Sequence, residues 1–383
     1  MDLEQYLQRW PNYELAKPES DSEIKNFCLL RGIEGKQFAF EYQREPSFFD
    51  FSQCQGDQVY TFIARLNKKI VGMGTVQVRS CYLYGKDSTI GYLSDLLINR
   101  EDSKKLQWRQ FVSDLLANAP KISEFKGVQH FLGVFVDDNI LAKSALYGSK
   151  RESDVLYKYL AGYHMVNLLA KPFPFLSKTN NNLKAATAEE TDKAALIQFL
   201  DNEQKNRAFG YKIKNGEWEY REKIWKNFSL ERFFIVKDPQ GKILGTCLPW
   251  SPAPSKKIYI RKLPIILKFI QRYNLLDTWL RIPGIDKQFK VLYLSNLEVD
   301  HKLNPIDAQR VFLALVDQMW QDIPRSRYHC ISFADFYKRP LLPKFSPYLC
   351  NKIPMQMRLI HHKNFTVPKL TNEELPGFEM ALV

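Results

Sequence analysis

The chain has 383 residues, which is too long for one ordinary hydrophobic core and suits two domains. Its residues are 45% hydrophobic and 25% charged, a composition typical of soluble globular proteins that excludes the disordered and fibrous classes. The formal net charge of +13 favours an anionic partner, but it does not choose among nucleic acid, a membrane surface and a phosphorylated cofactor.

Two further features of the composition concern the cellular compartment. No apolar run reaches the length needed to span a bilayer, and the acidic, polar start Met1–Gln5 is unlike a secretory signal peptide. Six cysteines are scattered without any C-x-x-C pair, which indicates free thiols in a reducing compartment and argues against a disulfide framework or a zinc site. We therefore expect a cytoplasmic protein without a transmembrane segment.

The first half of the chain predicts alternating strands and helices. The expected elements are a helix at 23–31, a strand pair turning at 67–69, a strand at 92–98, a helix after Ser103, a strand at 131–136, a helix from 139 and a strand at 164–169. Ser103 is expected to cap its helix. The apolar face of that helix is expected to consist of Leu106, Phe111, Val112, Leu115 and Leu116. Residues 177–182, rich in Asn and Ser, predict a linker.

The second half predicts the same kinds of element in the same order. The expected elements are a helix at 188–206, a strand pair turning at 238–241, a strand at 293–299, a helix after Asn304 and a strand at 328–333. Asn304 is expected to cap its helix, with Pro305 in the first turn. The apolar stripe of this helix is expected to consist of Val311, Phe312, Leu315 and Met319.

The two halves share a repeated motif. Tyr92-Leu-Ser-Asp-Leu-Leu-Ile98 reappears as Tyr293-Leu-Ser-Asn-Leu-Glu-Val299, and the strands before and after each copy follow in the same order. Self-similarity at a long period is the signature of a duplicated domain. We therefore predict two tandem α+β domains, an N-terminal domain at 1–178 and a C-terminal domain at 179–383.

The copies differ in the length of one connection, which is a basic insert at 251–290 in the second. From Ser251 to Lys290 there are nine Lys or Arg and two Asp, a net charge of +7 out of +13 for the chain. A basic amphipathic segment can bind an anionic membrane or an acidic partner. Alternatively, its apolar residues pack on the second domain while its lysines face water; those residues are Ile265, Ile266, Phe269, Leu275 and Leu276.

The order of elements resembles the GNAT superfamily of acyl-CoA N-acyltransferases. Val71-Gly-Met-Gly74 and Gly91-Tyr-Leu-Ser-Asp-Leu96 look like the third and fourth strands of that fold. The resemblance implies a mixed central sheet whose fourth strand splays from the fifth, flanked by helices. It also implies that the pantetheine arm of acetyl-CoA or another acyl-CoA pairs with the fourth strand, here at Leu96, Leu97 and Ile98. The pyrophosphate would then rest on the N-terminus of the next helix.

The phosphate site of that family uses a glycine-rich loop, because glycine lets the backbone approach the ligand closely. Neither copy has a glycine there. In the first copy, Lys104, Lys105 and Arg109 could neutralise the phosphates instead, although a solvated helix end is the alternative explanation of these charges. The second copy has Pro305 and Asp307 at this place. We therefore expect any coenzyme A to bind to the first domain.

Two residues of the first domain are candidates for catalysis. Asp95 could act as a general base on an ammonium substrate; alternatively it makes a structural hydrogen bond at the splay, as Asn296 would in the second copy. The resemblance implies that Tyr147 protonates the leaving thiolate, with Tyr337 in a comparable place. Glu298 is a further carboxylate, but a glutamate on a strand edge is expected to face solvent. The six histidines have no ligand spacing, so no metal site is predicted.

Three functions fit these observations. The first is an acyl-CoA-dependent N-acyltransferase with an acetyltransferase-like donor, in which the amine of a small molecule or a peptide attacks the thioester directly. The second is a non-catalytic tandem protein that has lost coenzyme A binding and serves as a binding or scaffold module. The third, a transferase that uses aminoacyl-tRNA, has the basic charge in its favour, but the long helical hairpin of such relatives is not evident in the sequence.

Overall fold

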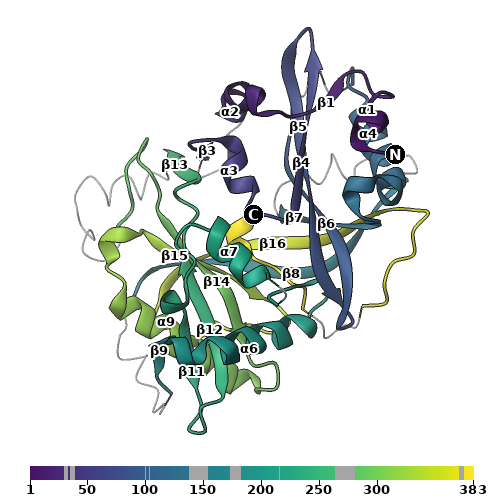
Figure 1. The fold of residues 1–383 in the computed structure, drawn as a ribbon. Coiled ribbons are helices and arrows are strands. Elements are labelled where there is room, and N and C mark those ends of the chain that lie inside the picture. Colours follow the sequence, from purple (N-terminus) through teal and green to yellow (C-terminus); the bar gives the residue numbers. More distant parts are fainter. Residues whose placement is uncertain are drawn as a thin grey trace.

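Both copies of the repeated motif form strands of one mixed sheet of thirteen strands, seen in the computed structural model in Figure 1. The structure describes residues 1–29, 33–34, 39–99, 101–102, 104–137, 154–172, 183–214, 216–263, 281–370 and 375–383. The strands of the large sheet are β1 (Tyr13–Leu15), β4 (Gln58–Leu66), β5 (Lys69–Leu83), β6 (Lys86–Ile98), β7 (His130–Val136), β8 (Val155–Ala170), β9 (Ala185–Thr187), β10 (Gly210–Tyr211), β11 (Phe234–Lys237), β12 (Ile243–Trp250), β14 (Val291–Val299), β15 (Cys330–Phe336) and β16 (Leu349–His362).

Helices flank this sheet, and a smaller sheet of three strands lies beside it (Figure 1). The α-helices are α1 (Leu3–Leu7), α2 (Asp21–Leu29), α3 (Phe48–Ser52), α4 (Trp108–Asn118), α6 (Lys193–Lys205), α7 (Glu217–Ile224) and α9 (Pro305–Asp322). The small sheet consists of β2 (Ile33–Glu34), β3 (Ala39–Arg44) and β13 (Lys256–Lys262). The expected α+β class is therefore confirmed. In the part of the chain that is described, no helix has the length and apolar character needed to cross a membrane.

The repeated strands occupy equivalent places in the sheet. β6 runs antiparallel to β5 and pairs in parallel with β7 only at Gly91 and Tyr92. Likewise, β14 runs antiparallel to β12 and pairs in parallel with β15 only from Val291 to Tyr293. Beyond Tyr92 and Tyr293 the paired strands part. The expected splay between the fourth and fifth strands is therefore present in both halves.

The two halves exchange their long last strands. β16 comes from the end of the chain and lies between β7 and β8, whereas β8 lies between β15 and β16. These two strands pair with each other from Leu349↔Ala170 to His362↔Val155. In Figure 1 they lie in the middle of the molecule, where its upper and lower parts meet. One continuous sheet therefore joins the halves. The expected linker at 177–182 lies outside the described residues, so the boundary at 178 stays a prediction.

Each half has its own hydrophobic core under a long helix. In the first half, α4 packs Phe111, Leu115 and Leu116 against strand residues such as Phe62 and Phe131. In the second half, the whole stripe expected for α9 is buried, and Phe312 packs on Phe333 with ring centroids 4.8 Å apart. The period of the apolar residues thus identified α9 correctly, whereas in the first half Leu106 is buried in the turn before α4 and Val112 is only partly buried.

The basic insert contacts the first half through a strand. β13 pairs antiparallel with β3, so that Lys256 lies opposite Arg44. Lys256 is 8% exposed, and Arg261 forms ion pairs with Glu41 and Asp286. The expectation that the lysines of the insert face water is therefore wrong for Lys256, because strand pairing with the first half buries it. The apolar residues of the insert at 265–276 lie outside the described residues.

Candidate functional site

The splay in each half is built by the backbone. Asp95 in β6 and Asn296 in β14 have φ values of 50° and 48°, in the left-handed region, beside a bulge in the pairing with the preceding strand. Bulges bend a strand and redirect its side chains. In the first half, Gly91 lies just before the splay, where an added Cβ would be 2.1 Å from the Phe131 ring. A residue without a side chain is therefore needed where β6 and β7 approach before they part.

Each residue at the splay accepts a hydrogen bond from a buried arginine. Arg44 Nη2 donates to Asp95 at 2.9 Å, and Arg221 Nη1 donates to the side-chain oxygen of Asn296 at 2.8 Å. Asp95 also accepts from the Ser94 hydroxyl at 3.2 Å. The structural role considered for Asp95 is therefore observed. Its role as a general base stays a prediction.

The surroundings of Asp95 include two basic residues that sequence reasoning missed. The Arg44 guanidinium lies 4.4 Å from the centre of the Phe51 ring, and Lys256 Nζ lies 5.0 Å from the same ring. Burial, and then the charge of Arg44, lower the pKa of Lys256 to about 7. Arg44 Nη1 is buried and has no hydrogen-bond partner among the described residues. No local pattern marks these residues, since β3 and β13 are far apart in the sequence.

The start of α4 is the expected phosphate site of the first half. The helix begins at Trp108, after Gln107 at φ 50°, and no side chain of the described residues caps it. The expectation that Ser103 caps this helix is therefore wrong, because a turn at 104–107 precedes the first helical residue. Ser103 itself lies outside the described residues. Lys104, Lys105 and Arg109 are exposed around this helix start.

The corresponding helix start in the second half is already occupied. The Asn304 side chain caps α9 by accepting from the Asp307 N–H at 3.0 Å, as its sequence indicated. Asp307 also forms an ion pair with Arg310 at 3.0 Å. Free N–H groups at a helix N-terminus bind anions, whereas a carboxylate and a cap at that place compete with them. Among the described residues, a side-chain cap is present at the start of α9 and absent at the start of α4.

The gap of the second half is filled by the chain itself. Glu379 inserts its carboxylate there and accepts a hydrogen bond from the backbone N–H of Asn296 at 2.8 Å. A cavity of about 60 Å³ remains beside it, with Leu294, Phe336 and Arg339 among its walls. Burial raises the pKa of Glu379 to about 7. The backbone N–H at the splay of this half is therefore not free for an acyl group.

Glu298 lies at the same gap and departs from expectation. It is 4% exposed, accepts from Gln204 Nε2 at 2.7 Å and forms an ion pair with Arg207. Burial raises its pKa against the lowering effect of Arg207. The expectation that this glutamate faces solvent is therefore wrong, because α6 packs near β14 and supplies Gln204, and the turn after α6 supplies Arg207.

The remaining candidate residues are those expected to pair with the donor and the two tyrosines. Leu96 is 46% exposed on β6, whereas Leu97 and Ile98 are half-buried and pair with Met73 and Gly72. Leu96 to Ile98 follow the point at which β6 and β7 part. Tyr147 lies outside the described residues, so its expected role as an acid stays a prediction. Tyr337 is 48% exposed after β15, with its ring 4.7 Å from that of His164.

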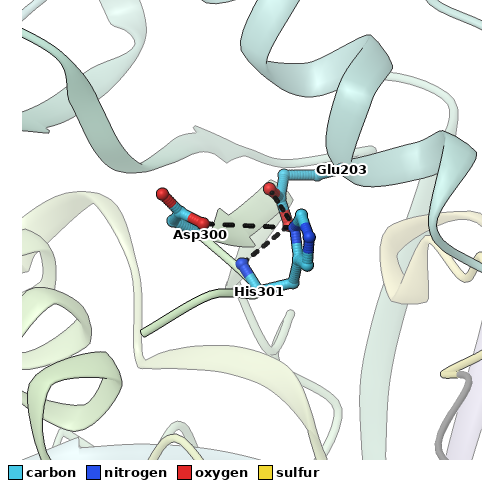
Figure 2. Close-up of side chains that lie close together, drawn as sticks. All are labelled: Glu203, Asp300 and His301. Carbon is cyan, nitrogen blue, oxygen red and sulfur yellow. Dashed lines mark hydrogen bonds and ion pairs between the residues drawn. The ribbon is translucent and has the colours of Figure 1, made fainter. Parts of the chain in front are cut away.

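One cluster of possible metal ligands joins α6 to the end of β14. Figure 2 shows Glu203, Asp300 and His301 close together, with dashed lines from His301 to both carboxylates. The backbone N–H of His301 and its Nδ1 both contact the Glu203 carboxylate, at 3.1 and 2.9 Å. Lys242 Nζ forms an ion pair with Asp300 at 2.6 Å. Because internal contacts already occupy both carboxylates, the cluster is explained as a structural link between the two elements.

Comparison with known proteins agrees with this architecture. No family model and no curated protein matches the sequence. Among solved structures, N-myristoyltransferase of Saccharomyces cerevisiae with bound myristoyl-CoA has a TM-score of 0.55 and 10% identity, over 91% of this chain and 82% of that one. A GCN5-related glucosamine N-acetyltransferase region in a fungal GH3 β-N-acetylglucosaminidase has a TM-score of 0.58 and 11% identity, over 91% of this chain and 38% of that one.

The likeness to these structures concerns the fold. Two observations, this likeness and the equivalent places of the repeated strands in the sheet, show that the chain has a tandem GNAT-like fold. The names of the similar proteins describe transferases of acyl groups to nitrogen.

Proposed function

We propose that the protein is an acyl-CoA-dependent N-acyltransferase that binds its donor in the gap of the first half. The observation that carries this proposal is the difference between the halves. In the first half, β6 beyond the splay leads to a helix start that no side chain caps in the described part of the chain. In the second half, Asn304 caps the helix and Glu379 takes the N–H of Asn296. The similarity to structures named as N-acyltransferases also supports this class of reaction.

The residues of the first half have separate roles in this proposal. Leu96 to Ile98 would pair with the pantetheine arm through their backbone, as an added strand does. Lys104, Lys105 and Arg109 would neutralise the phosphates at the start of α4. Gln107 already has the left-handed φ that glycine usually provides. In this proposal, the left-handed backbone at Gln107 would take the place of a glycine of the family motif.

The reaction would be a direct transfer. The amine nitrogen attacks the thioester carbon, the carbon–sulfur bond breaks, and the coenzyme leaves as its thiol. Backbone N–H groups of β6 would stabilise the negative charge that develops on the carbonyl oxygen. Asp95, or a water that it holds, would accept the proton that the amine loses, and Tyr147 would give a proton to the thiolate. The donor would be acetyl-CoA or a longer acyl-CoA such as myristoyl-CoA, and the acceptor a small-molecule or peptide amine.

An Asp95→Asn variant separates the catalytic from the structural role of Asp95. Asn296 holds the equivalent place and accepts from Arg221, so an asparagine at 95 is expected to keep the bond to Arg44. If Asp95 is the base, kcat should fall by about 100-fold or more while the melting temperature stays within a few degrees. The assay follows free thiol released from a panel of acyl-CoAs with amine acceptors. Unchanged kcat in the variant would remove Asp95 from the mechanism.

The alternative is a non-catalytic tandem protein that uses the fold as a binding module. The absence of glycine at both helix starts favours it. The same thiol-release assay distinguishes the two functions when it is combined with measurements of binding. Acyl-CoA that binds without any release of thiol, across a broad panel of amines, would favour the module. Release that depends on an added amine would favour the enzyme.

A further inference from the structure

The two most exposed large apolar side chains among the described residues lie in the second half, outside both gaps. Phe345 is 82% exposed in the 337–348 loop, which joins β15 to β16, and Ile306 is 65% exposed in the first turn of α9. A single exposed apolar side chain needs no explanation, whereas a group of them marks an interaction site. Whether these two belong to one surface depends on how the loop lies against the helix.

The loop is held against the start of α9. Gln309 Nε2 donates to the Pro340 carbonyl at 3.2 Å, and Arg339 Nη2 donates to the Asp300 carbonyl at 2.7 Å. Three prolines among the twelve residues of the loop also restrict its backbone. We call the loop together with residues 301–310 the loop–helix surface. Because this surface is already ordered, little chain entropy is lost when a partner covers it.

The charge of the loop–helix surface is positive. It contains five Lys or Arg and one Asp, a net charge of +4, and the Asp is paired with Arg310 at 3.0 Å. Lys302, Lys338 and Lys344 are exposed. Lys344 Nζ lies 6.0 Å from the centre of the Phe345 ring. Exposed cations and exposed apolar side chains therefore occur on the same surface.

This combination fits a partner that is apolar inside and anionic at its boundary. A bilayer with anionic lipid has both properties, because an aromatic ring can enter between headgroups and acyl chains while lysines meet the phosphates. The 337–348 loop contains no Asp or Glu that the headgroups would repel. Charge complementarity and the exposed ring thus favour a lipid surface as the occupant.

β13, the strand of the basic insert, offers less to such a partner. Lys256 is buried by the pairing of β13 with β3, and Arg261 forms ion pairs with Glu41 and Asp286. Burial and ion pairing therefore reduce the charge that this strand presents to an anionic surface.

We propose that the loop–helix surface docks the protein on an anionic phospholipid bilayer, with Phe345 inserted between the headgroups and Ile306 at the same boundary. The docking is independent of the proposed function, because neither gap takes part in it. It gives a binding role to the second half, in whose gap Glu379 already occupies the N–H of Asn296.

Co-sedimentation of the full chain with vesicles tests the docking without acyl-CoA. At low salt, the affinity should be at least tenfold higher for vesicles of phosphatidylcholine with phosphatidylserine than for phosphatidylcholine alone. Phe345→Ser should weaken binding to the anionic vesicles about tenfold or more, because the ring no longer leaves water. Leu156→Ser is the matched control, since Leu156 is 44% exposed on β8, and it should bind as the wild type does.

Paired lysine variants separate this surface from the overall charge of the chain. Lys338→Gln with Lys344→Gln should weaken binding to anionic vesicles about tenfold, because two cations leave the contact with the headgroups. Lys121→Gln with Lys126→Gln removes the same charge from exposed positions of the first half and should change the affinity less than about twofold. Equal losses in the two pairs would overturn the proposal.

A tryptophan at position 345 reports insertion directly. When anionic vesicles are added, the emission of Phe345→Trp minus that of the wild type should move to shorter wavelengths, and brominated acyl chains should quench it. No sedimentation with anionic vesicles, or no change in this emission, would overturn the proposal. Self-association of the lipid-free chain that Phe345→Ser abolishes would also overturn it and would assign the surface to a second copy.

Discussion

Replacing Glu379 by glutamine should change how stability depends on pH. The carboxylate is 8% exposed in the gap of the second half, where it accepts from the N–H of Asn296. Glutamine has the same shape and keeps one oxygen for that N–H, but it cannot ionise. Glu379→Gln therefore removes the charge and leaves the packing of the gap in place.

The size of the effect follows from the pKa. Burial raises the pKa of Glu379 from 4.5 to about 7 in the folded protein. In the unfolded chain the carboxyl ionises first as pH rises, so the folded state loses relative stability from about pH 4.5 until its own carboxyl has ionised near pH 7. At about 1.4 kcal/mol for each unit of pKa difference, the loss between pH 5 and pH 8 is about 2.5 kcal/mol. Glu379→Gln has no ionisable group at this position, so its stability does not fall for this reason.

Urea unfolding followed by tryptophan fluorescence at pH 5, 6, 7 and 8 measures the effect. The free energy of unfolding of Glu379→Gln minus that of the wild type should rise by about 2.5 kcal/mol across this range. Other titrating groups, such as Asp335, cancel in the difference. Glu231→Gln is the control, since a hydrogen bond from Ser229 lowers the pKa of that exposed carboxyl, so its replacement should give no rise across this range. Parallel curves for Glu379→Gln and the wild type would refute the reasoning.

Two further predictions concern the fold. Gly91→Ala should destabilise the protein by about 1–3 kcal/mol in urea unfolding, because the added Cβ would overlap the buried Phe131 ring. Gly72→Ala is the control, since its Cβ would have no neighbour closer than 3.5 Å. Equal losses of stability in the two variants would contradict the argument. Cleavage at a protease site engineered between 173 and 182 should leave both fragments together in gel filtration, since β8 pairs with β15 and β16. Separation of the fragments without denaturant would show that the exchanged strands do not hold the halves.

Local patterns in the sequence were sufficient for the repeated part of the fold. The echo of Tyr92–Ile98 in Tyr293–Val299 identified two strands that take equivalent places in the sheet. The apolar stripe of α9 and the Asn304 cap were visible because both depend on residues within a few turns of each other. The strand exchange was not visible. Alternation of apolar residues indicates which face of a strand is buried, but not which strand lies beside it.

The candidate sites were harder to predict for the same reason. Asp95 and the lysines before α4 could be chosen because they flank a recognisable motif. Arg44 and Lys256 could not, because each reaches its site by packing against residues far away in the sequence. Glu379 fills the gap of the second half from a segment that has no periodic pattern. Charges that become buried through such contacts cannot be told apart from surface charges in a single sequence.

Titration calorimetry with acyl-CoAs tests the central claim, that one donor binds in the gap of the first half. We predict one bound acyl-CoA per chain for acetyl-CoA or for a longer donor. Lys104→Glu with Lys105→Glu should weaken binding at least tenfold, or by about 1.4 kcal/mol. Lys302→Glu, exposed just before α9, should leave it unchanged. No heat with any acyl-CoA, or full affinity in the double variant, would contradict the account.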